Sequence, residues 1–123
     1  MGNFSMSATN AVWNDDLPIY RQITDIIIRR VLDGVYPEGE LLPSVRGVAD
    51  EFNVSPLTAA KVFQELDKEG LTIKRRGIGA EVSPNSRARL LESERAKFLN
   101  EEWPRIQERI RRLELDPAKL LSE

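Results

Sequence analysis

The chemistry open to this chain is limited by the residue types it lacks and by where its cations lie. The 123 residues contain neither histidine nor cysteine, which removes disulfides, thiolate nucleophiles and the commonest general base and metal ligand at neutral pH. The only three consecutive cations before residue 84 are Lys74, Arg75 and Arg76, and Arg46 lies earlier in the chain. Side chains of this kind are suited to contact phosphate groups.

Paired carboxylates are the remaining candidates for catalysis. Asp15 and Asp16 are adjacent, as are Glu101 and Glu102, but both pairs lie in charged stretches without an apolar pocket that would raise a pKa. No acid and base in distinct environments and no cluster of metal ligands can be assembled from the sequence. We therefore expect a protein that is not an enzyme and that has no catalytic residue, cofactor or metal.

The overall charge does not favour binding to a polyanion. The formal net charge is −2 and the isoelectric point is near 5.3. Residues 1–82 hold nine Lys and Arg residues against twelve Asp and Glu residues. Any basic surface must therefore be local.

Apolar spacing predicts the helices that would position the cations. A helix is expected over about 18–33, with Asp16 as a candidate cap, and a loop follows in which Leu41 and Leu42 are candidates for a short strand. Ser44 is the expected N-cap of a short amphipathic helix that ends near Asn53.

A second capped helix follows almost at once. Ser55 is its expected N-cap, Pro56 takes the first helical position, and Gly70 ends it. Two short helices joined in this way fit a helix-turn-helix, although helical hairpins with the same pattern also occur in proteins that never touch DNA.

A short hairpin is expected after these helices. The letters LTIK and AEV indicate two strands, and the turn between them contains Gly77 and Gly79. The cations Lys74, Arg75 and Arg76 lie at the tip and its approach. They form either a solvated charged hairpin or a wing that contacts phosphates, and the neighbouring helix pair favours the wing.

Four segments together resemble the GntR family of bacterial regulators, and within it the YtrA subgroup. They are PIYRQI at 18–23, LLPSVRGVADEF at 41–52, VSPLTAAKVFQELDKEGL at 54–71 and RRGIGAEV at 75–82. The resemblance implies a mainly α fold with a small β-wing. It places a flexible arm at 1–13, a winged helix-turn-helix DNA-binding domain at 14–83 and a short helical dimerisation region at 84–123.

The resemblance also implies which residues contact DNA. Arg46 corresponds to a DNA-contacting arginine, and Leu57 stands where the family reaches the bases and could meet a thymine methyl group. The full set of expected contacts is Ser44, Arg46, Ser55, Leu57, Thr58, Lys61, Gln64, Lys74, Arg75, Arg76 and Gly77.

Several of these residues also have a purely structural interpretation. Arg46 could pair with Asp50 one helical turn away. Ser55 could be fully occupied as a cap, and Gln64 could simply face solvent. Any tight hairpin favours a glycine where Gly77 stands.

Three positions depart from the family pattern. Pro56 and Ala60 stand where members have arginine, so those contacts to the major groove are not carried over to this chain. Gly47 replaces the glutamate that would complete a capping box, which should weaken the start of that helix by up to about 1 kcal/mol.

The last forty residues are strongly helical in composition, and Pro104 should kink or split the helix. Their apolar spacing is that of one helix packing on another, either on the chain's own domain or on a second copy, and we favour the dimer. The expected interface residues are Leu91, Phe98, Leu99, Trp103, Ile106, Ile110 and Leu113.

These features lead to one leading functional hypothesis. We expect a cytoplasmic homodimer that represses transcription by binding a palindromic double-stranded DNA operator, with a transporter operon as the target class that the resemblance implies. No membrane segment is expected, and nothing identifies a small-molecule effector. The rival interpretation is a winged-helix module that binds protein, which the acidic isoelectric point favours.

Overall fold

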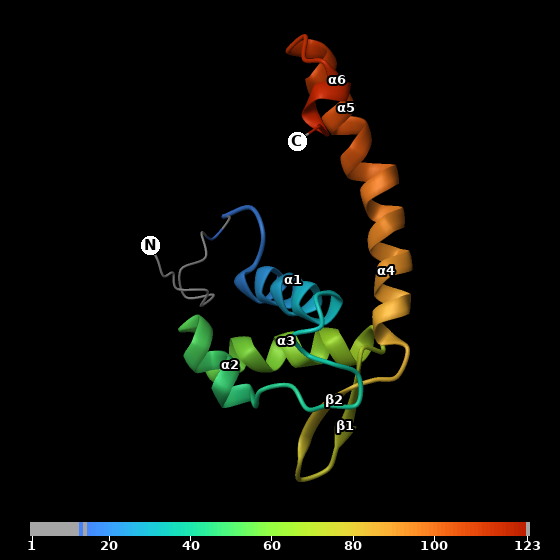
Figure 1. Ribbon diagram of the computed structural model, residues 1–123. Helices are drawn as coiled ribbons and strands as arrows, with labels where there is room; N and C mark the ends of the chain where they lie inside the picture. Colours follow the sequence, from blue (N-terminus) through green and yellow to red (C-terminus); the bar gives the residue numbers. More distant parts are fainter. Residues whose placement is uncertain (1–12, 14, 123) are drawn as a thin grey trace. The chain divides into compact units, whose positions relative to one another are not determined.

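The structure is a computed structural model that describes residue 13 and residues 15–122 (Figure 1). The chain divides into two compact units, Met1–Ala88 and Arg89–Glu123. The elements are, in order, α1 (Ile19–Leu32), α2 (Val45–Phe52), α3 (Pro56–Lys68), β1 (Thr72–Arg75), β2 (Gly79–Val82), α4 (Ser86–Lys97), η2 (Phe98–Glu102), α5 (Trp103–Arg112) and α6 (Pro117–Leu120). The predicted mainly helical fold with a two-stranded wing is confirmed. Apart from Trp13, the arm predicted at 1–13 lies outside the described residues.

The core of the first unit forms where α3 packs against α1 and α2 (Figure 1). On α3, Ala59, Val62 and Leu66 are at most 1% exposed, and on α1 Ile23 and Ile27 are equally buried. Burying a Val, Leu or Ile side chain stabilises a fold by about 1.5–3 kcal/mol. The buried face of α3 is therefore held firmly, and its opposite face remains in solvent.

Side-chain caps fix the short connection between α2 and α3. The Ser44 hydroxyl accepts a hydrogen bond from the Gly47 N–H at 3.0 Å, and the Ser55 hydroxyl accepts one from the Thr58 N–H at 3.1 Å. Asn53 ends α2 in the left-handed region, with φ of 55°, a conformation that asparagine tolerates well. Both predicted N-caps are confirmed, and the helix-turn-helix is built from local signals.

The wing is an antiparallel hairpin of β1 and β2, in which Arg75 pairs with Gly79. The three-residue loop between the strands is closed by a hydrogen bond from the Ile78 N–H to the Arg75 carbonyl at 2.9 Å. Gly77 has a φ of +74° in this loop, which L-residues adopt only at a cost. The glycine is therefore required by the backbone of the turn.

Two local predictions need correction. The N-cap position of α1 is held by Pro18, with no side-chain cap, so Asp16 lies two residues too early to cap the helix. Leu41 forms only an isolated bridge with Glu81 rather than a strand. The Leu42 N–H donates to the Ala80 carbonyl and the Val82 N–H to the Glu40 carbonyl, so the bridge consists of the bonds on either side of Leu41.

The second unit is helical, and Pro104 changes its helical type. The α-helical pattern of α4 gives way to the π-helical stretch η2, and α5 begins at Trp103. Proline has no N–H for the bond to the fourth residue before it, and π-helical turns are one way to accommodate such an interruption. The predicted division at Pro104 is confirmed, but Trp103 keeps helical angles, with φ of −59° and ψ of −43°. Asp116 caps α6 through the Ala118 N–H.

No helix in residues 15–122 is both long and apolar enough to cross a membrane. The same part of the chain contains no cluster of acidic residues arranged to hold a metal ion.

Arg30 connects α1 to α2 through a half-buried cluster. Its guanidinium donates hydrogen bonds to both carboxylate oxygens of Glu51, at 2.6 and 3.2 Å, and to the Tyr36 hydroxyl at 2.8 Å. It also lies 5.5 Å from the centroid of the Phe52 ring, against which Trp13 packs at 6.3 Å. The hydrogen bonds that Arg30 donates to Glu51 raise the pKa of Arg30 above its ordinary value, so the guanidinium stays charged.

We predict that Arg30→Met lowers the free energy of unfolding by about 1–3 kcal/mol, because it removes hydrogen bonds from a charged group and leaves Glu51 half-buried without them. Urea denaturation followed by circular dichroism measures the change. The exposed neighbour Arg29 provides the matched control, and Arg29→Met should change stability by less than about 0.5 kcal/mol. Equal losses in the two variants would contradict the structural role of Arg30.

Candidate nucleic-acid interface

The exposed face of α3 is formed by residues spaced at helical intervals. Leu57, Lys61 and Gln64 are all exposed, and Leu57 has 73% of its surface in solvent. The opposite face, with Val62 at its centre, is buried in the core. An exposed leucine in the first turn of a helix gains nothing from folding, so it is available for a partner.

Two other predicted contact residues at the start of α3 are occupied by the helix itself. Besides accepting the Thr58 N–H, the Ser55 hydroxyl donates its proton to the Thr58 hydroxyl oxygen at 3.1 Å. The capping interpretation of Ser55 is therefore the arrangement that the structure contains. Further along, the Lys61 ammonium lies 5.7 Å from the centroid of the Tyr20 ring, a cation–π contact that restrains it while leaving it exposed.

Arg46 occupies the second position of α2 and is exposed. In the part of the chain that the structure describes, no ion pair joins it to Asp50, so the alternative of a surface pair is not formed. Ser44, two residues earlier, is exposed and serves as the N-cap. The start of α2 therefore presents a guanidinium that can turn outward.

The three cations of the wing are not equivalent. Lys74 and Arg76 are exposed, whereas the Arg75 Nε donates to Glu81 at 2.8 Å. That hydrogen bond and the accompanying charge attraction hold the pKa of Glu81 below, and that of Arg75 above, their ordinary values. Glu81 stands opposite Ile73, so Arg75 and Glu81 form a diagonal pair across the two strands. Aligning the two predicted strands in this register would have revealed the pair from the sequence.

An apolar groove joins the start of α2 to the wing. It has a volume of about 620 Å³ and is lined by Pro43, Val45 and Phe63 on one side and by the wing from Lys74 to Ala80 on the other. Ile78, at the wing tip, is 68% exposed. Sequence reasoning did not single out Val45 or Ile78. The signal for Ile78 was a large aliphatic residue between two turn glycines, where hairpins usually carry polar residues.

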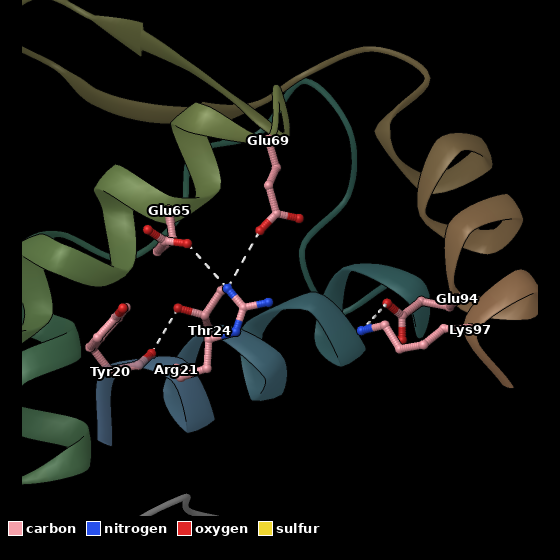
Figure 2. Close-up of polar contacts among 7 residues, drawn as sticks. All are labelled: Tyr20, Arg21, Thr24, Glu65, Glu69, Glu94 and Lys97. Atoms are coloured by element: carbon pink, nitrogen blue, oxygen red, sulfur yellow. Dashed lines mark hydrogen bonds and ion pairs between the residues drawn. The ribbon is translucent and has the colours of Figure 1, made fainter. Parts of the chain in front are cut away.

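Two carboxylates near the end of α3, Glu65 in the helix and Glu69 at its C-cap, are paired with α1. Figure 2 shows Arg21 of α1 reaching both Glu65, at 3.1 Å, and Glu69, at 3.8 Å. In the same view the buried Thr24 hydroxyl donates to the Tyr20 carbonyl at 2.8 Å. The acidic second half of α3 is thus compensated by α1.

Charge is segregated along the chain in a way that overall composition conceals. The segments 41–49, 52–64 and 70–80 contain no aspartate or glutamate, yet they hold Arg46, Lys61, Lys74, Arg75 and Arg76. These segments form the start of α2, the turn and first half of α3, and the wing as far as Ala80, and the carboxylate that follows in the wing, Glu81, is paired with Arg75. They are the predicted site elements, and α2 and the wing line one groove. A local basic surface therefore exists within a unit of acidic composition.

Comparison with known proteins places this arrangement among bacterial regulators. The model of the gntR family of bacterial regulatory proteins matches residues 19–82. The HTH-type transcriptional repressor YtrA of Bacillus subtilis (strain 168) is 37% identical over 75 residues, which cover 61% of this chain and 58% of YtrA. This chain therefore matches little more than half the length of that curated relative.

Solved structures support the same placement. A GntR family transcriptional regulator from Listeria monocytogenes is 30% identical with a TM-score of 0.70, over 89% of this chain and 94% of that one. AraR(DBD), solved in complex with operator ORX1, is 27% identical with a TM-score of 0.53, over 55% of this chain and 81% of that one. These relatives are transcription regulators, which confirms the prediction that the chain is not an enzyme.

We predict that the carboxyl group of Glu81 titrates below its ordinary range and that Arg75→Ala returns it to that range, while Lys74→Ala leaves it low. Carbon-detected NMR of the side-chain carboxyl measures this. Because the pKa of Glu81 is depressed in the folded state, the pair stabilises the wing above the unfolded pKa, and this contribution is lost as pH falls through the folded pKa. The same titration curve in wild type and Arg75→Ala would show that the pair does not form.

Proposed function

The chain belongs to the GntR family of bacterial regulatory proteins, and we propose that it is a homodimeric repressor that binds a palindromic DNA operator. As a member of this family it is a DNA-binding transcription regulator with a winged helix-turn-helix. The dimer, the repressor role, the operator symmetry and the individual contacts are the proposal. The name of the B. subtilis relative, a transcriptional repressor, supports the direction of regulation.

The observation that carries the DNA interface is the segregation of charge. Five cations stand at the start of α2, on the first half of α3 and on the wing, and the one carboxylate of the wing, Glu81, is paired with Arg75. Binding to a DNA backbone draws its free energy largely from contacts between cations and phosphates and from the release of counterions. A partner protein would gain comparably from this surface only if its own surface were acidic, whereas every DNA duplex presents phosphates, so this distribution favours DNA over the protein-interaction module.

Each part of the interface has a proposed role. Arg46, Lys74 and Arg76 contact phosphates, and Leu57 lies against a thymine methyl group in the major groove beside Gln64. The remaining residues hold these side chains in place or approach the backbone, and they are Ser44, Ser55, Thr58, Lys61, Arg75 and Gly77. Residues 14–83 would thus serve as the DNA-binding domain.

The proposed dimer interface is the apolar surface of the second unit. Phe98, Leu99, Ile106 and Leu113 are each between 39% and 59% exposed, and the Phe98 and Trp103 rings stack at 6.2 Å. Helical side chains of this size are normally covered. A second copy would cover them and would hold two recognition helices at the fixed separation that half-sites one helical turn apart require.

We also propose where the protein acts and which class of target it controls. A cytoplasmic site of action suits a protein that meets chromosomal DNA, and a transporter operon is the target class expected for members that resemble YtrA. We propose no cofactor and no specific effector.

The DNA-binding proposal is tested by selecting sequences from a random duplex pool and titrating the selected operator over a range of salt concentrations. The logarithm of the affinity should fall steeply with the logarithm of the salt concentration. Arg46→Ala and Arg76→Ala should each reduce that slope by about 1, because each removes one phosphate contact. Arg29→Ala, which removes an exposed cation of α1, should leave the slope unchanged. Salt-independent binding, or no selected sequence at all, would instead support the protein-binding module.

The dimer proposal predicts that the double variant Ile106→Asp, Ile110→Asp is monomeric by multi-angle light scattering, because two carboxylates would be buried without partners in the interface. Arg105→Asp, on the same helix and exposed in the structure, should remain dimeric. Circular dichroism checks that both variants keep their helices. An unchanged mass for the double variant would refute this interface.

A further inference from the structure

We propose that Ile78, at the tip of the wing, lies in the minor groove of the operator and makes the protein favour A·T base pairs there. The inference rests on the DNA binding proposed above and adds to it a residue that determines sequence preference. Major-groove arginines are missing at Pro56 and Ala60, so part of the discrimination must come from elsewhere.

The position of Ile78 is the first support. It is the last residue of the three-residue wing loop, its backbone is fixed by the hydrogen bond to the Arg75 carbonyl, and its side chain is 68% exposed. Around the flanking Gly77 and Gly79, no atom lies within 4 Å of where a Cβ would stand. Open space therefore surrounds the two glycines, and the aliphatic side chain between them is one that the fold itself does not bury.

The surroundings of Ile78 identify the chemistry of its partner. Lys74 and Arg76 on the same hairpin are exposed cations, while the apolar lining continues from Ile78 across the groove to Val45 and Phe63. A partner that fits this surface must carry negative charge where it meets Lys74 and Arg76, and it must be apolar where it meets Ile78. A DNA strand has this character, because phosphates flank the minor groove and the faces of the deoxyriboses form its walls.

The preference for A·T pairs follows from the functional groups on the groove floor. A G·C pair places the guanine N2 amino group in the minor groove, whereas an A·T pair has only acceptors there. Isoleucine has no acceptor for that amino group, so seating the side chain over G·C would strip the group of water without replacing its hydrogen bond. Runs of A·T pairs also narrow the minor groove and increase its negative potential, which suits the cations beside Ile78.

The test changes the minor groove alone. In the operator selected by the wild-type protein, each adenine is replaced in turn by 2,6-diaminopurine, which adds only the minor-groove amino group, and each guanine by inosine, which removes it. The wild type should lose affinity about 5-fold or more at a few adjacent adenines in each half-site. Ile78→Ala should bind the parent operator more weakly and should respond less than 2-fold at the same positions.

The matched control is Leu57→Ala, which should also weaken binding to the parent operator but should keep the full response to 2,6-diaminopurine, because Leu57 is assigned to the major groove. Thermal melting checks that both variants fold, as expected for two exposed side chains. The inference would be overturned if Ile78→Ala kept the full response to 2,6-diaminopurine, or if the wild type responded at no position. It would also be overturned if a change in oligomeric mass were the only effect of Ile78→Ala. If the wild type selects no DNA, the proposed function itself fails.

Discussion

The buried face of α3 is the constraint on which the rest of the DNA-binding unit depends. Val62 and Leu66 are fixed between α1 and α2, so the helix can neither roll nor slide without exposing them. This packing holds Leu57 and Lys61 outward at a set angle to the wing. The Ser44 and Ser55 caps set where each helix of the pair begins, and Gly77 lets the wing turn tightly enough to present a single side chain.

The net charge of this protein is a poor guide to its partner, because several of its carboxylates are paired with arginines of α1. Arg21 compensates Glu65 and Glu69 on the face of α3 toward α1 (Figure 2), and Arg30 compensates Glu51. Within the proposed interface, the start of α2 and the first half of α3 contain no acids, and the wing carboxylate Glu81 is paired with Arg75. The result is a basic surface of modest strength, on which apolar contacts at Leu57 and Ile78 must supply part of the discrimination between sequences.

Features set by neighbouring residues were predictable from the sequence, and those set by contacts across the fold were not. The caps at Ser44 and Ser55 and the hairpin turn at Gly77 follow from local propensity and were predicted correctly. The pairing of Arg75 with Glu81 follows from the hairpin register, in which Glu81 stands opposite Ile73, so it becomes evident only once the two strands are aligned. The exposure of Ile78 likewise became visible only when both strands and the groove were in place.

The proposed DNA interface is tested most directly by mapping the amide chemical-shift changes that occur when isotope-labelled protein binds its selected operator duplex. The largest chemical-shift changes should fall on residues 44–47, 55–61 and 74–78, and the changes on the outward face of α1 should be small. Large changes on α1 or α5, with those three segments unmoved, would contradict the proposed interface.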